Sequence, residues 1–119
     1  MNDLVDLAKK KKTARVRELN DSLRRTFAGG RVVLTAGVAA LSEETRAAVL
    51  RSVRSFDDGA FDPSNDPYGE HDFIAFELDG QTYFAKVDYY NEDLSGGSED
   101  PADPEKTTRV LTIMRADEY

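Results

Sequence analysis

Apolar positions between residues 14 and 28 recur at steps of three and four, which is the spacing of one face of an α-helix. The stripe consists of Val16, Leu19, Leu23 and Phe27. The pair Gly29-Gly30 follows directly, and glycine commonly ends a helix. The pattern therefore predicts a helix over residues 14–28. Upstream, Leu4 and Ala8 continue the stripe and could extend the helix, but Lys12 falls where the next apolar residue is needed. We therefore expect residues 1–13 to form a basic, flexible segment.

A second group of elements follows the glycines. Residues 31–35 form a short β-branched apolar run, which is typical of a strand. Ser42 then precedes two glutamates, and a hydroxyl before acidic residues is a common start of a helix. The apolar positions downstream have helical spacing and are Val49, Leu50, Val53 and Phe56. We expect a second amphipathic helix here.

The strongest local signal is the stretch HDFIAFELDGQTYFAKVDYY, residues 71–90. Its two β-rich runs flank Asp79-Gly80, a dipeptide that favours a two-residue hairpin turn. If Leu78 faces Gln81, the register places Ile74 opposite Ala85 on one face of the hairpin. A last strand is expected from about residue 107 to residue 115.

Two long loops, residues 57–69 and 91–106, are rich in Asp, Gly, Ser and Pro. The predicted helices and strands follow the order α-β-α-β-β-β along the chain. We therefore expect residues 14–119 to form a single α+β domain, a two-layer sandwich of a four-stranded, mostly antiparallel sheet and two helices. A chain of 119 residues can bury roughly two thirds of its unfolded surface, which suffices for such a core.

Charge is distributed unequally along the chain. Residues 1–55 contain 12 Lys or Arg and 6 Asp or Glu, whereas residues 56–119 contain 4 and 17, and the net charge is −7. Such asymmetry can steer partners of opposite charge. Cysteine is absent, which excludes disulfides and thiolate chemistry and suits the cytoplasm. The chain has no apolar run long enough for a membrane helix, so we expect no membrane association.

His71 is the only histidine, and the hairpin register places it opposite Asp88 and next to Lys86. A carboxylate beside an imidazole fixes its tautomer, as in general bases and metal-ligating histidines. His71, Asp88 and Lys86 are therefore the candidate catalytic residues. The alternative is that His71 and Asp88 merely close the open end of the hairpin. One histidine without a nucleophile motif or zinc-ligand spacing indicates no metal and no cofactor.

Acidic and aromatic residues near this end of the hairpin are candidates for a binding surface. They are Glu70, Asp72, Tyr90, Asp93, Glu99, Asp100 and Asp103. Neither long loop follows the EF-hand spacing, so calcium binding is disfavoured. The basic run Lys9 to Lys12 could contact phosphates, but it lacks interleaved aromatic residues and the protein is acidic, so direct nucleic-acid binding is disfavoured.

Several stretches together carry a family resemblance. FAGGRVVLTAGVAAL, DPYGEHDF, KVDYYNEDLSGGSEDPADP and TTRVLTIMRADEY resemble successive blocks of the bacterial domain-of-unknown-function family 3768. The resemblance covers about residues 14–119 and implies cargo of plasmids and other mobile elements, without implying catalytic residues. The sequence departs from the family pattern at Ala85, where an aromatic residue is expected, and at Ile74-Ala75, which replaces a small flexible position.

Three functional hypotheses follow from these observations. The first is a non-enzymatic protein-binding module that docks, as a monomer or small homo-oligomer, on a basic, nucleic-acid-binding host protein. Rows of Asp and Glu can imitate duplex phosphates, so such a module could act as an anti-restriction or anti-CRISPR inhibitor or DNA mimic. The second is a small enzyme or metal site centred on His71 and Asp88. The third is a DNA-binding accessory protein that works through its basic first helix.

Overall fold

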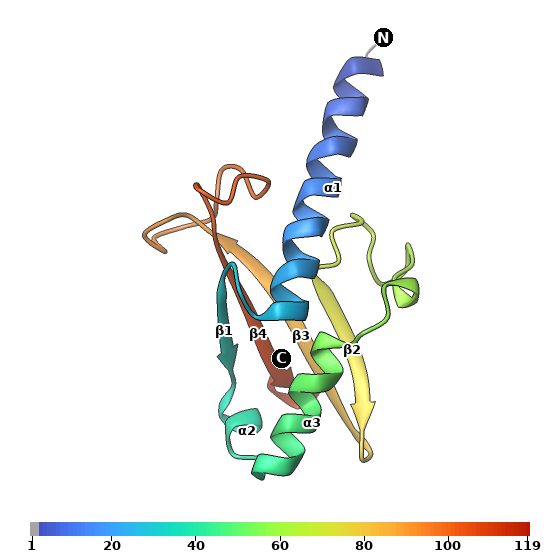
Figure 1. The fold of residues 1–119 in the computed structure, drawn as a ribbon, viewed down its shortest axis with the longest axis vertical. Coiled ribbons are helices and arrows are strands. Elements are labelled where there is room, and N and C mark those ends of the chain that lie inside the picture. Colours follow the sequence, from blue (N-terminus) through green and yellow to red (C-terminus); the bar gives the residue numbers. More distant parts are fainter. Residues whose placement is uncertain (1–2) are drawn as a thin grey trace.

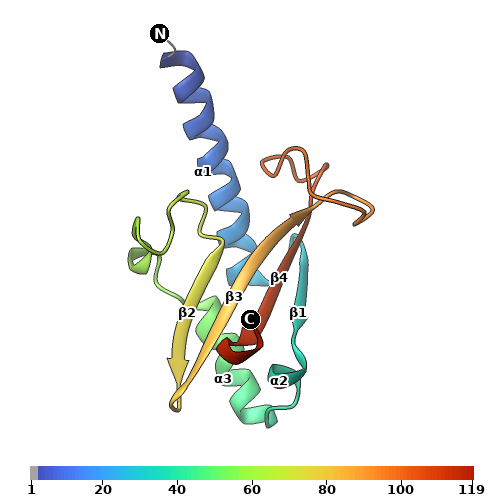
Figure 2. The same cartoon turned by 180° about the vertical axis from the view of Figure 1, so that it is seen from behind.

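The computed structural model describes residues 3–119 and contains one four-stranded sheet with helices on one of its faces (Figure 1). The strands are β1 (Arg31–Leu34), β2 (Phe73–Leu78), β3 (Gln81–Tyr90) and β4 (Thr108–Arg115). Their order in the sheet is β1-β4-β3-β2, and only the β1–β4 pair is parallel. Figure 2 shows the same sheet from behind, where no α-helix covers it and the C-terminal 3-10 turn η2 (Ala116–Glu118) lies over part of it. The predicted two-layer, mostly antiparallel α+β fold is confirmed.

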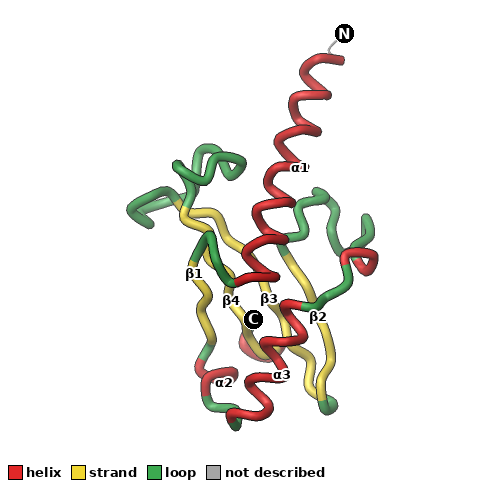
Figure 3. Tube along the Cα trace, viewed as in Figure 1, coloured by secondary structure: helices red, strands yellow, loops and turns green. Residues whose placement is uncertain are grey.

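Three α-helices lie on the covered side: α1 (Asp3–Thr26), α2 (Ala36–Ala39) and α3 (Glu43–Arg54). Ser42 caps α3 as predicted, since its hydroxyl accepts a hydrogen bond from the Thr45 amide at 3.2 Å. The short helix α2 was not predicted. Two 3-10 turns, η1 (Asp58–Ala60) and η2 (Ala116–Glu118), complete the elements (Figure 3). Within residues 3–119, no helix combines the length and the apolar character needed to span a bilayer.

Helix α1 begins at Asp3, well before the predicted start at residue 14. Its first half extends beyond the sheet, away from the other elements (Figure 1). Leu4 is 82% exposed there, and Lys9 to Lys12 are also exposed. Acidic residues in the first turn and arginines in the last turn complement the helix dipole, so local charge supports a helix longer than the apolar stripe alone indicates. Residues 1–2 of the predicted flexible segment lie outside the described residues.

The hairpin forms with the predicted register, in which Leu78 pairs with Gln81 and Ile74 with Ala85. Asp79 and Gly80 have φ angles of 51° and 78°, as a two-residue turn of this kind requires. The register sends alternate residues of β3 to opposite faces, and those facing the helices are buried.

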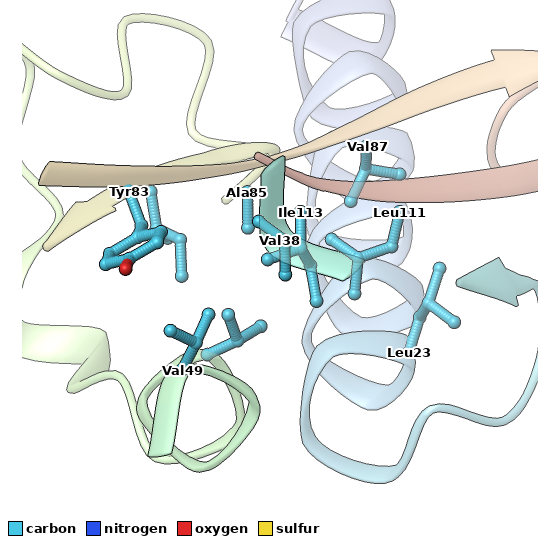
Figure 4. Packing of buried hydrophobic residues seen from close by; sticks show 10 residues of the cluster. Leu23, Val38, Val49, Tyr83, Ala85, Val87, Leu111 and Ile113 are labelled. Carbon is cyan, nitrogen blue, oxygen red and sulfur yellow. The ribbon is translucent and has the colours of Figure 1, made fainter. Parts of the chain in front are cut away.

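The hydrophobic core lies between the sheet and the helices α1, α2 and α3 (Figure 4). Leu23 from α1, Val38 from α2 and Val49 from α3 are fully buried against Leu111 and Ile113 of the central strand β4. Both β4 and β3 are inner strands that pair on two sides, and β4 supplies Leu111 and Ile113 to the core.

Candidate functional site

His71 lies on the helix-covered side, at the edge of a polar cluster formed with α1 and the loop 57–72. Its φ of 54° turns the chain just before β2, and the ring stacks on Phe61 with centroids 3.8 Å apart and planes 6° apart. The His71 Nδ1 lies 2.9 Å from Asp21 Oδ1, and Nε2 lies 3.7 Å from Asp66 Oδ2. Asp66 also accepts hydrogen bonds from the backbone amides of Glu70 and His71. These contacts fix the ring against α1.

Arg24 occupies the centre of the cluster, and it is 2% exposed. Its Nη2 donates to Asp21 at 3.1 Å and to Asp58 at 2.9 Å, while Nη1 donates to the carbonyls of Val53 and Phe56 at the end of α3. Burial alone would raise the pKa of Asp58, but hydrogen bonds and charges from Arg25 and Arg24 outweigh it and lower that pKa. Arg24 thus joins two helices and the loop.

Asn20, fully buried one turn earlier on α1, organises the neighbouring polar groups. Its amide donates to the Glu70 carbonyl at 3.0 Å and to the Tyr89 hydroxyl at 2.8 Å, and it accepts from Arg109 Nε at 3.0 Å. The Tyr89 hydroxyl donates in turn to Glu70 Oε1 at 2.8 Å. Burial, followed by the neighbouring Glu70, raises the pKa of Tyr89 far above its ordinary value, so the phenol stays protonated.

The groups Asp21, Asp58 and His71 place one ligand atom each within 4.8 Å of one another, which is close enough to consider a cation. Both carboxylates, however, bind the guanidinium of Arg24. A metal ion would have to displace this buried positive charge or lie beside it, and like charges at such distances repel strongly. The donor set therefore fits an ion-pair network better than a metal centre.

The predicted pair of His71 and Asp88 is wrong. The hairpin register continues only to Asp72, whose carbonyl accepts from the Val87 amide at 2.8 Å. The positive φ of His71 then carries its side chain to the helix side, while Asp88 lies on the opposite face of the sheet and binds Lys86 Nζ at 2.8 Å. That hydrogen bond raises the pKa of Lys86. The three candidate catalytic residues consequently do not form one site.

The candidate binding residues also divide between two places. Glu70 belongs to the Asn20 network. Asp72 lies close to it, and burial, with the nearby charges of Glu70, Asp66 and Asp88, raises the pKa of Asp72. The polar cluster therefore has an acidic rim, whereas the remaining candidates lie at the far end of β3 or in the loop beyond it.

Residues 91–106 form the acidic loop, which joins β3 to β4 and contains six Asp or Glu and one Lys. Three of the predicted binding residues hold this loop together: Asp93 accepts from the Ser95 amide, Asp100 from the Ala102 amide and Asp103 from the Glu105 amide. The hydrogen bonds from Ser95 lower the pKa of Asp93. Glu99 is exposed and pairs with Lys106 at 3.5 Å. A shallow hollow of about 410 Å³ lies among these side chains.

The helix-free side of the sheet is a second candidate surface, here called the open face. From β1, β2 and β3 it includes Val33, Phe73, Phe84, Lys86, Asp88 and Tyr90, which alternate with more buried residues of their strands. From β4 it includes Val110, Thr112 and Met114, and Met114 is buried. The C-terminal Tyr119 packs edge-on against Phe73 and Phe84, with centroids 6.0 and 5.7 Å away. Glu118 holds this tail, since it accepts hydrogen bonds from Thr35 and from the Gly37 amide.

Sequence reasoning missed the buried polar residues Asn20, Arg24 and Arg109. Asn20 and Arg24 lie three to four residues from the apolar positions Val16, Leu23 and Phe27, so their place on the helix was available as a signal. Their hydrogen-bond partners come from distant loops and strands, and no local pattern contains those.

The fold and this network define a two-layer α+β domain with a buried structural polar cluster and one uncovered sheet face. A family model described as "Protein of unknown function (DUF3768)" matches residues 34–118. The chain therefore belongs to this family, as its sequence blocks suggested. Comparisons with curated proteins and with solved structures gave no match.

Proposed function

We propose that this protein is a non-enzymatic protein-binding module, and that it docks a basic partner on the open face and the adjoining acidic loop. The observation that carries the proposal is the sheet itself: α-helices cover one face, whereas on the other face only the C-terminal turn η2 and Tyr119 lie over part of the aromatic residues (Figure 2). Antiparallel sheets with one solvated face usually carry polar residues there, so aromatic residues on such a face favour an interface.

Apolar side chains support this location. Among the large hydrophobic residues that the structure leaves exposed, Val33 is 44% exposed on the open face, Leu94 is 40% exposed in the acidic loop and Tyr119 is 76% exposed beside Phe84. Aromatic residues are enriched at the centres of protein interfaces, and polar residues at their rims. The open face with the acidic loop at its end has this arrangement.

Charge supports a basic partner. The acidic loop has a net charge of −5, from six acidic residues and one lysine, and Glu92, Glu99 and Glu105 are exposed within it. A cluster of one sign at the rim of an interface increases the rate of encounter with a partner of opposite sign. The partner we propose is a basic, nucleic-acid-binding protein of the host, met in the cytoplasm.

The proposal gives His71 a structural role. Its Nδ1 is engaged by Asp21, one face of its ring is covered by Phe61, and its side chain is 14% exposed. A general base needs free access to the proton that it removes. The same residue, by holding the loop 57–72 on α1, keeps β2 and therefore the open face in place.

Capture of host proteins on the purified protein and on matched variants tests the proposal. The test variant changes Glu92, Glu99 and Glu105 to Gln, which removes three exposed charges and leaves the Asp residues that organise the acidic loop. The control changes Glu18, Glu43 and Glu44 to Gln, which alters the net charge equally on the helices. We expect a basic protein to bind the parent and the control, and to bind the test variant much more weakly.

Salt and surface substitutions separate this mechanism from nonspecific attraction. About 0.5 M salt shortens the Debye length to roughly 4 Å and should release most of the partner. Phe84→Ser on the open face should weaken binding even at low salt, because it removes apolar contact. Equal retention of the partner by the parent and by both the Glu triple variant and Phe84→Ser would contradict the proposal.

A further inference from the structure

A basic cleft lies on the helix side of the molecule, away from the open face. The C-terminal ends of α1 and α3 meet there (Figure 1), and the shallow, open cleft between them is lined by Arg25, Arg51, Arg54 and Ser55, with a volume of about 510 Å³. Its arginines come from two helices that are far apart in sequence. We call this hollow the arginine cleft.

The fold holds two of these arginines in place. Arg54 Nε donates to the Arg25 carbonyl at 3.1 Å, and its guanidinium lies 5.3 Å from the centroid of the Phe27 ring. The Arg25 guanidinium pairs with Asp58. Pre-positioned guanidinium groups lose less side-chain freedom when a ligand binds.

Arg51 is exposed, and within residues 3–119 its guanidinium makes no hydrogen bond or ion pair. All of its N–H donors are therefore available at the wall of the arginine cleft. Arg51 lies in the last turn of α3 and is not part of the hydrophobic core, so we expect its replacement to leave the core intact.

The helix ends do not account for all of this positive charge. Three arginines line the arginine cleft and Arg24 lies behind it, which gives four positive charges. Two carboxylates, Asp21 and Asp58, pair with them and leave an excess of two positive charges. The C-terminal ends of two helices contribute roughly half a negative charge each. About one positive charge remains without a counter-charge in a protein whose net charge is −7.

We propose that the arginine cleft binds a phosphate group. Guanidinium groups bind phosphate through paired, charge-assisted hydrogen bonds, and one negative charge of the phosphate offsets the local excess of about one positive charge. The volume of about 510 Å³ exceeds the need of a lone phosphate and suits the phosphate end of a small metabolite or nucleotide. The site is independent of the protein-binding surface, because it lies on the other layer of the fold.

Isothermal titration of the full chain with inorganic phosphate, and separately with a nucleoside monophosphate, tests the proposal in a chloride buffer. We expect saturable one-to-one binding of phosphate, and Arg51→Gln should weaken it by about tenfold, the loss of one hydrogen bond to a charged group. The matched control is Arg31→Gln, which removes an exposed arginine on β1 and should leave the affinity unchanged. Thermal unfolding of both variants checks that they remain folded.

The outcomes separate the sources of the phosphate. Tighter binding of the monophosphate than of inorganic phosphate identifies the phosphate end of a larger molecule, and equal affinities identify the free ion. Absence of saturable binding up to about 10 mM of either probe would overturn the proposal. Equal weakening by Arg51→Gln and Arg31→Gln, or binding of a DNA duplex that neither phosphate probe displaces, would overturn it as well.

Discussion

Asn20→Ala removes the side chain at the centre of the buried network, and the structure gives the size of the expected loss. The variant leaves the Glu70 carbonyl, the Tyr89 hydroxyl and Arg109 Nε each without one hydrogen-bond partner. At about 1 kcal/mol for each neutral group and about 2 kcal/mol for the charged one, the free energy of unfolding should fall by roughly 3–4 kcal/mol. This is a large part of the stability of a typical domain of this size.

Urea unfolding followed by circular dichroism measures this loss. With a slope of about 1.5 kcal/mol per molar urea, the midpoint should fall by roughly 2 M, without a change of slope. Ser22→Ala is the matched control, since Ser22 is exposed two residues further along α1 and its substitution should change stability by less than about 0.5 kcal/mol. A loss below about 1 kcal/mol for Asn20→Ala would refute the reasoning that these three groups depend on Asn20 for their hydrogen bonds.

Three further predictions concern other parts of the structure. Burial and neighbouring charges raise the pKa of Asp72 in the folded state, so above about pH 4 the folded protein binds more protons than the unfolded chain, and its stability falls as pH rises. Asp72→Asn should therefore be more stable than the parent at pH 7 but not at pH 3. An equal difference in stability at both pH values would contradict this. Gly30→Ala places a Cβ 2.7 Å from the Arg109 carbonyl oxygen, and thermal unfolding should show a stability loss of about 2 kcal/mol. In the control Gly96→Ala the new Cβ lies 3.8 Å from its nearest neighbour, so the loss should be small. Similar losses for both variants would contradict the clash. His71→Ala loses the stack on Phe61 and puts alanine at a φ of 54°, so the free energy of unfolding should fall by roughly 2 kcal/mol. Proteolysis within residues 57–69 should also become faster. Unchanged cleavage there would contradict the role of His71 in holding this loop on α1.

Local chemistry made much of the fold predictable. Asp79-Gly80 determined the turn and with it the pairs from Leu78–Gln81 to Phe73–Lys86, and Ser42 marked the start of α3. Helix α1, in contrast, starts at Asp3, eleven residues before the start that its apolar stripe predicts. Its first turns bury little, so helix propensity and terminal charges, rather than packing, account for them.

The polar cluster was predictable only in part. The hairpin register located Asp72 correctly, but one positive φ at His71 was enough to reverse the direction of its side chain. That angle is stabilised by Asp66, which receives two backbone amides, and by Phe61 from the preceding loop. Such contacts arise from the packing of a long loop on α1, which sequence periodicity does not encode.

The position of β4 has a consequence for how the chain acquires its structure. The last strand in sequence is an inner strand of the sheet, and β1, which is separated from it by more than seventy residues, has no other neighbour. During synthesis, α1, β1 and α3 therefore emerge with their apolar faces unmatched, and the hairpin alone is a weak template. Folding has to wait for β4 and then proceeds in one cooperative step, with a slow search caused by its distant pairings. We therefore expect the nascent polypeptide to stay accessible to chaperones and proteases until β4 has been synthesised.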